Sequence, residues 1–243
     1  MTSRPAEELA ETLVQLADTQ VDEFDLDAFL RLLADRCVRL LDVDAAALLV
    51  VEDDGEEPVI GASGETAERL ELLEVANDEG PSLDSCRDGT VVVEPDLAKA
   101  ADRWPTFATA ALAAGFAAVH TIPLRLRSEV IGALNLFRGH PGELDPVVAR
   151  IGRAMADVAT IGLLHTRALR QQKELAAQLQ NALTSRVIIE QAKGVVGERL
   201  GLTMDAAFTT LRSYARSHNE KLAELAGSVV DGSFDTRVLR PPA

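Results

Sequence analysis

Apolar positions divide the chain into a mixed region of helices and strands and a helical region that follows it. Helical spacing in 5–20, 25–41 and 66–76 contrasts with strand-like runs in 45–51, 58–62, 90–94, 117–126 and 130–137. Pro105 begins a short helix that Gly115 ends, and the segment 80–90, rich in Gly, Ser and Asp, is predicted to be a loop. These elements predict an α+β domain with an antiparallel sheet and flanking helices.

A single long helix is predicted from Asp145 to about Leu200. Asp145 and Pro146 supply a cap and a first-turn proline, and the next proline is Pro241. At ~1.5 Å per residue this helix would be on the order of 80 Å long, too long to be buried in one domain. Two separate helices with a bend near Gln171 are the alternative. A seven-residue apolar repeat along this helix indicates a parallel two-stranded coiled coil, and hence a homodimer. The repeat consists of Ile161, Ala168, Leu175, Ala182, Ile189 and Val196.

Residues 182–232 are predicted to form a compact module of three short helices. Gly201 ends the first helix, Thr203 caps the second, and Gly232 follows the third. The inward positions are Leu183, Val187, Ile188, Ala192 and Val195, then Phe208, Leu211 and Ala215, and finally Leu222, Leu225, Ala226 and Val229. Arg186, Lys193 and Arg199 lie off the first apolar stripe, which gives that helix a partly basic face.

The distribution of charge separates this module from the rest of the chain. The 243 residues carry 39 acidic and 24 basic side chains, a net charge of −15, which argues against a protein that coats nucleic acid. Residues 1–180 hold 32 of the acidic and 16 of the basic side chains, whereas residues 181–243 hold 7 and 8. Only the C-terminal module could approach a polyanion without strong repulsion, and we expect it to make few phosphate contacts.

Few residues point to catalysis or metal binding. The two cysteines, Cys37 and Cys86, share no ligand spacing, and the four histidines are scattered along the chain. No serine or cysteine lies in a nucleophile motif, and no phosphate-binding loop is present. Acidic residues interrupt the apolar ones at the N-terminus, and no apolar run approaches a membrane span. We therefore expect a cytoplasmic protein that is not an enzyme and has no metal, cofactor or membrane contact.

Four motifs of the helical module closely resemble the ANTAR family of RNA-binding antitermination regulators. They are SRVIIEQAKG at 185–194, G-x-T-x-x-x-A-F at 201–208, LR-x-x-A at 211–215 and N-x-K-L-x-x-x-A at 219–226. Members of that family are three-helix domains that, as dimers, recognise two neighbouring stem-loops in nascent messenger RNA and prevent a terminator from forming. The resemblance implies RNA as the partner, with RNA polymerase affected indirectly.

The residues expected to bind RNA are basic, polar, aromatic or small. Proteins read RNA loops with Arg, polar groups and stacking rings, and small residues let the backbone approach. The candidates are Arg186, Gln191, Ala192, Lys193, Gly194, Arg212, Tyr214 and Arg216. The resemblance favours Lys193, Arg212 and the surface of Ala192 and Gly194, whereas each isolated Arg is alternatively a solvated charge or a partner of Glu190 or Glu198. Phe208 and Leu211 are interpreted as core residues.

The N-terminal region resembles the GAF family of small-molecule sensor domains. The motifs, in order, are a GP-x-x-x-x-x-x-x-G loop at 80–89, R-W-P-x-F at 103–107, H-T-I-P-L at 120–124 and V-I-G-A-L-N-L-F at 130–137. In GAF domains joined to ANTAR modules a cysteine commonly follows the Gly-Pro pair, and here Ser82 takes that place. A small-molecule ligand is implied, with Arg103, Trp104, Phe107 and His120 as candidate pocket residues. Trp104 beside a proline is alternatively a packing residue, and His120 a structural one.

The predicted organisation is an N-terminal helix at 1–21, a GAF-like sensor at 22–164, a coiled-coil connector at 165–181, an ANTAR module at 182–232 and a tail at 233–243. The favoured function is signal-responsive antitermination by a dimer that binds tandem stem-loops. The main alternative is a ligand-sensing protein whose helical tail docks on a partner protein through Leu222 or Leu225. A DNA-binding regulator is disfavoured because 201–203 does not introduce a helix rich in base-reading side chains.

Overall fold

The computed structural model describes residues 25–51 and 57–239, which form two compact units divided between Arg170 and Gln171. The predicted helix at 5–20 and the turn of the first hairpin lie outside the described residues. No helix in the described part of the chain is both long enough and apolar enough to cross a membrane.

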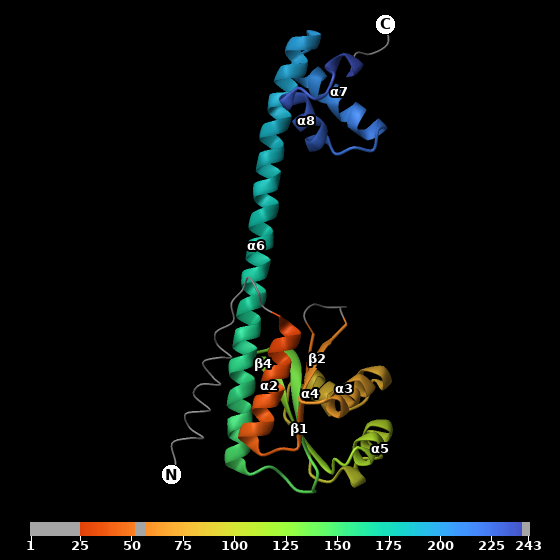
Figure 1. Ribbon diagram of the computed structural model, residues 1–243, viewed down its shortest axis with the longest axis vertical. Helices are drawn as coiled ribbons and strands as arrows, with labels where there is room; N and C mark the ends of the chain where they lie inside the picture. The colour runs from red at the N-terminus through yellow and green to blue at the C-terminus, as the bar shows by residue number, and fades with distance from the viewer. Residues whose placement is uncertain (1–24, 52–56, 240–243) are drawn as a thin grey trace. The chain divides into compact units, whose positions relative to one another are not determined.

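A five-stranded antiparallel sheet is the centre of the first unit (Figure 1). Its strands are β1 (Ala45–Val50), β2 (Val59–Ala62), β3 (Val92–Glu94), β4 (Ala118–Leu126) and β5 (Glu129–Arg138), in the spatial order β2-β1-β5-β4-β3. All five strands were predicted within a few residues. Alternating side chains of one strand therefore enter two separate cores, as Leu134 and Leu136 do on one face and Phe137 on the other.

Helices cover both faces of the sheet. One core lies under α2 (Leu26–Leu41) and the first part of α6 (Pro146–Leu200), and includes Leu33 and Met155. The other lies under α3 (Glu65–Asn77), α4 (Pro81–Asp88), the short 3-10 helix at Leu97–Lys99 and α5 (Pro105–Ala113). Asp25 caps α2 as predicted, since its side chain accepts a hydrogen bond from the backbone N–H of Ala28. These layers confirm the predicted α+β class.

The loop prediction for residues 80–90 is wrong, because most of this segment is α4. Pro81 occupies the first turn, where its fixed φ suits a helix. No side chain within the segment caps it; instead a carboxylate oxygen of Glu74 accepts hydrogen bonds from the N–H groups of Ser82 (2.8 Å) and Leu83 (3.4 Å). The Gly- and Ser-rich composition therefore concealed a helix whose cap comes from α3.

The long helix is confirmed: α6 is one helix from Pro146 to Leu200 rather than two. The seven-residue repeat is only partly available for pairing, because Val196 is buried in the core of the second unit and Ile189 packs against it. Conversely, Leu183 and Val187, predicted to face inward, are about 60% exposed. The apolar stripe of α6 thus passes from an exposed face into the module core within two turns.

The second unit packs the end of α6 against α7 (Met204–Ser217) and α8 (Leu222–Asp231), which confirms the three-helix module. The segment predicted as a tail contributes to it. Thr236–Leu239 forms a short 3-10 helix, Leu239 is buried in the module core, and Phe234 packs beside it. The module therefore extends to Leu239 among the described residues.

Replacing Leu239 with Ala should destabilise the helical unit by about 2 kcal/mol, the lower end for a buried Leu→Ala change. Val238→Ala is the matched control, because Val238 is 59% exposed. Urea unfolding followed by circular dichroism should show the loss, while fluorescence of Trp104, the one tryptophan and a core residue of the sensor, should be unaffected. Equal midpoints for the two variants would contradict the inclusion of Leu239 in the core.

Candidate functional site

A groove of about 650 Å3 runs along the outer face of α7. Its lining repeats at helical spacing, and consists of Phe208, Thr209, Arg212, Ser213, Arg216 and Ser217. The opposite face of α7 carries Ala207, Leu211 and Ala215 into the module core. Thr203 begins the helix by accepting a hydrogen bond from the N–H of Ala206. The amphipathic pattern of α7 thus leaves two guanidinium groups and three hydroxyl groups toward solvent.

The structure brings together only part of the predicted RNA-binding set. Arg212 and Arg216 both line the groove. Arg186 and Gln191 are exposed on α6, outside the groove lining. Ala192 is fully buried in the module core, which corrects its assignment to a contact surface: it lies on the apolar stripe of the helix. At Gly194 an added Cβ would meet nothing within 4 Å, so the backbone there is open to close approach.

Lys193 is already engaged. Its Nζ lies 2.9 and 2.8 Å from the two carboxylate oxygens of Glu190 and 5.7 Å from the centroid of the Phe208 ring. The Lys193 side chain is 15% exposed, whereas that of Glu190 is 59% exposed. The ammonium group is therefore held between a carboxylate and an aromatic ring, and a phosphate would have to compete with Glu190 for it.

The aromatic residues of the module differ from the predicted arrangement. The ring of Tyr214 stacks on His218 with centroids 3.9 Å apart, and Phe234 packs edge-on at 5.2 Å. Tyr214, predicted to stack on a base, is thus occupied by neighbours within the module. Phe208, predicted as a core residue, is only half-buried and borders the groove, whereas Leu211 is buried as predicted.

A buried polar cluster in the sensor went unpredicted. Glu71 and Glu74 of α3 are fully buried, and both accept hydrogen bonds from the side-chain amide of Asn135, at 2.6 and 3.0 Å. The hydroxyl of Ser82 donates to Glu71 at 3.0 Å, and Thr121 donates to Asn135 across the β4–β5 ladder. A signal was present in the sequence, because the two glutamates share the helical spacing of the buried Ala67 and Leu70.

Burial controls the protonation of this pair. Loss of hydration raises the pKa of Glu71 to about 7, against hydrogen bonds from Ser82 and Asn135 that lower it. Burial and the neighbouring charge of Glu71 raise the pKa of Glu74 well above its usual range. Burial and, to a smaller extent, the negative charges of Glu71 and Glu74 also raise the pKa of the Cys86 thiol to about 12. Cys86 is therefore held as a thiol, and Ser82 serves the carboxylates as a hydrogen-bond donor.

The candidate ligand residues near α5 form a packed and hydrogen-bonded junction. One carboxylate oxygen of Asp84 accepts hydrogen bonds from the Arg103 guanidinium and the Trp104 indole, both at 3.0 Å. Trp104 and Phe107 are buried in the second core, with their rings edge to face at 6.0 Å. Glu79 accepts from the N–H of Phe107 at 2.9 Å and so caps α5. These contacts support the packing alternative for Trp104, while ligand contact by this group stays a prediction.

His120, the fourth candidate, lies elsewhere, on β4. Its ring is half-buried, and burial lowers the pKa of the imidazole while the charge of Glu143 acts in the opposite direction. Among the residues that the structure describes, no group of three or more His, Cys, Asp or Glu side chains could hold a metal ion.

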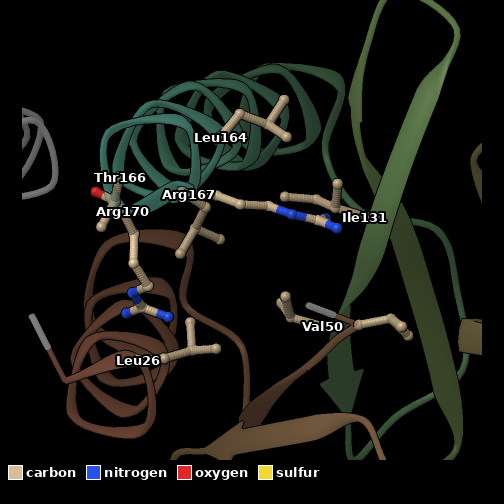
Figure 2. Close-up of a pocket in the computed structure, with 9 residues that line it drawn as sticks. Leu26, Val50, Ile131, Leu164, Thr166, Arg167 and Arg170 are labelled. Atoms are coloured by element: carbon tan, nitrogen blue, oxygen red, sulfur yellow. The ribbon is translucent and has the colours of Figure 1, made fainter. Parts of the chain in front are cut away.

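A small cavity lies where α6 passes the open end of the first core (Figure 2). Leu26, Val50 and Ile131 line it together with α6 residues that include Arg167 and Arg170, and Arg167 extends toward Ile131. Its volume of about 20 Å3 is enough for a water molecule but not for a small-molecule ligand.

Comparisons with known proteins agree with this architecture. The GAF domain family matches residues 24–164, and the ANTAR domain family matches residues 177–230. No curated protein matches the chain.

Two solved structures share the fold of the first unit. The GAF domain of an Acinetobacter phosphoenolpyruvate-protein phosphotransferase is 12% identical and has a TM-score of 0.54, with 69% of this chain and 97% of that chain covered. Free methionine-R-sulfoxide reductase from Neisseria meningitidis, solved with its substrate, is 16% identical and has a TM-score of 0.51, with 68% and 91% covered. Similarity at these identities establishes the fold alone.

The Glu71–Glu74 pair should make the stability of the sensor depend on pH. The pKa of Glu71 is about 7 in the folded protein against 4.5 ordinarily, so the folded state holds the extra proton between these values. The contribution of the Glu71 proton to the free energy of unfolding is therefore fully present below about pH 4.5 and is lost as the pH rises through about 7.

Glu71→Gln retains a neutral hydrogen-bonding side chain and should remove the part of this dependence that Glu71 contributes, whereas Glu74, whose pKa burial also raises, keeps its own part. We expect its Tm to exceed that of the unmodified protein by a few degrees at about pH 8 and to approach it at about pH 5. Glu65→Gln, an exposed change on the same helix, should leave the pH dependence of Tm intact. A Glu71→Gln curve parallel to that of the unmodified protein would show that Glu71 does not retain the proton.

Proposed function

The chain belongs to the GAF family and carries a C-terminal ANTAR domain, and on this basis we propose that it is a dimeric cytoplasmic regulator that binds paired stem-loops in nascent messenger RNA and promotes antitermination. GAF domains are sensor domains and ANTAR domains belong to RNA-binding antitermination regulators, so both parts are regulatory rather than catalytic. Three points go beyond membership in these families and are our proposal: the RNA consists of paired stem-loops, the protein binds it as a dimer, and the sensor controls the RNA-binding module.

The observation that carries the RNA proposal is the groove of α7. Arg212 and Arg216 lie one turn apart on an exposed face that also carries three hydroxyl side chains. This face belongs to residues 181–243, which hold 8 basic and 7 acidic side chains, whereas residues 1–180 hold twice as many acidic as basic side chains. RNA would therefore be attracted to the module and repelled by the rest of the protein.

Dimerisation is supported by an exposed apolar row on α6. Leu175, Leu179, Leu183 and Val187 recur every four residues and are each 56–61% exposed. An exposed apolar row of this kind marks an interaction surface, and its overlap with the predicted coiled-coil connector makes a second copy of the chain the partner that we propose. Two modules joined in this way would bind two neighbouring hairpins, and the linkage can raise avidity by about two to four orders of magnitude over one contact.

The sensor would act through α6, because this helix contributes to both cores. Met155 and Ala159 pack in the sensor, and Ala192 and Val196 pack in the module. A ligand can shift the helix between two states only by the difference in its affinity for them. Ligand binding would therefore change the fraction of dimers whose two modules can bind both hairpins at once.

The structure argues against the alternative in which the helical tail docks on a partner protein through Leu222 or Leu225. Leu225 is buried in the module core and Leu222 packs against it, so neither offers a free apolar surface. Substitutions there would disturb the fold of the module rather than report on a partner.

Arg212→Ala combined with Arg216→Ala should weaken binding to a two-hairpin RNA by at least about tenfold, because two phosphate contacts are lost. The slope of log affinity against log salt should fall by about 1.4, at ~0.7 per contact for single strands. Fluorescence anisotropy at several salt concentrations measures both quantities. Arg237→Ala removes an exposed arginine paired with Asp235 outside the groove and should change neither. Unaltered binding by the double variant would place the RNA elsewhere.

Leu179→Glu combined with Leu183→Glu should convert the dimer to a monomer, because four carboxylates would face one another across the seam. Both positions are exposed, so circular dichroism should remain that of the folded chain. The matched control is Gln180→Glu with Thr184→Glu, the same charges at the same spacing but turned about 100° around the helix. Sedimentation equilibrium that gives one mass for both variants would exclude the row as the dimer contact.

A further inference from the structure

We propose that Phe208 is the ring on which an unpaired RNA base stacks, with the base in the α7 groove and its flanking phosphates against Arg212 and Arg216. This inference rests on the proposed RNA-binding function and assigns the position of one nucleotide within it. The argument begins with the ring itself. Phe208 follows the buried Ala207, so it is turned about 100° from the core-facing line of α7 and borders the groove.

The other rings of the module are engaged. Tyr214 is covered by His218 and by the edge of Phe234, and Phe234 packs against the module core. Phe208 is the one aromatic side chain in the lining of the groove. Because base stacking needs an accessible π surface, the geometry favours Phe208 over Tyr214.

Two positive charges follow Phe208 in a row along α7. Arg212 and Arg216 lie four and eight residues further on, on the same face of α7. A base on the ring would therefore direct its sugar-phosphate backbone along a row of two guanidinium groups. All of the lining residues lie on α7, so the groove is open to solvent and a nucleotide can reach the ring without displacing any other part of the module.

Lys193 has a different role from the one that its sequence position suggested. Its ammonium group is bound to Glu190 and lies over the Phe208 ring, so it fixes the ring by a cation–π contact instead of presenting a free charge to phosphate. Lys193 is thus a positioning residue for the stacking ring. The hydroxyl of Ser213, which also lines the groove, can hydrogen-bond the edge of the stacked base.

The test uses the full chain and two-hairpin RNAs in which 2-aminopurine replaces, one at a time, each adenine of the loops. Stacking on a ring quenches 2-aminopurine fluorescence, and anisotropy gives the affinity of each complex. Phe208→Leu keeps an apolar side chain and removes the ring, whereas Phe208→Tyr keeps the ring. Circular dichroism checks that both variants fold.

We expect one loop position to be quenched by the unmodified protein and by Phe208→Tyr, and released in Phe208→Leu. The affinity of Phe208→Leu should be about 5- to 140-fold weaker, the range for loss of one base stack. Equal affinity and equal quenching for Phe208→Leu would overturn the assignment while leaving RNA binding intact. Absence of RNA binding by the unmodified protein would instead overturn the proposed function, and this inference with it.

Discussion

One continuous helix is shared by two hydrophobic cores, and this constraint governs the rest of the structure. The buried residues near the start of α6 complete the sensor core under the sheet, and those near its end complete the three-helix module. Between them, residues 171–184 are exposed. If the helix rotates or shifts in either core, the side chains packed in that core have to rearrange. Because packed cores allow few such rearrangements, each unit has a small number of discrete arrangements.

The two ends of this helix meet different chemical environments. In the sensor, the face of the sheet away from α6 contains two buried carboxylates that neutral donors stabilise, and protonation keeps them compatible with burial. In the module, the groove of α7 is polar, carries Arg212 and Arg216 and is open to solvent. This division agrees with a protein that receives a signal in a closed, packed domain and delivers it through an accessible charged surface.

Much of the architecture could be predicted from sequence because its causes are local. Pro146 begins α6, no proline interrupts it, and Gly201, at a positive φ, follows its last residue, while alternation of apolar residues identifies the strands. The features that were missed have causes distant in sequence. The cap of α4 is Glu74 on another helix, and Tyr214 is covered by Phe234, twenty residues later, so local pattern alone favoured a loop and an exposed tyrosine. The ring that borders the groove, Phe208, was assigned to the core because it shares helical spacing with Leu211 and Ala215, whereas Ala207 takes the buried position.

The central claim, that paired modules recognise paired hairpins, is tested most directly by one comparison of affinities. The full chain is titrated against an RNA with two adjacent stem-loops and against an RNA of equal length in which one stem cannot form. The account predicts binding at least about 100-fold tighter to the paired hairpins, the gain expected when two linked contacts form together. Equal affinity for the two RNAs would contradict it.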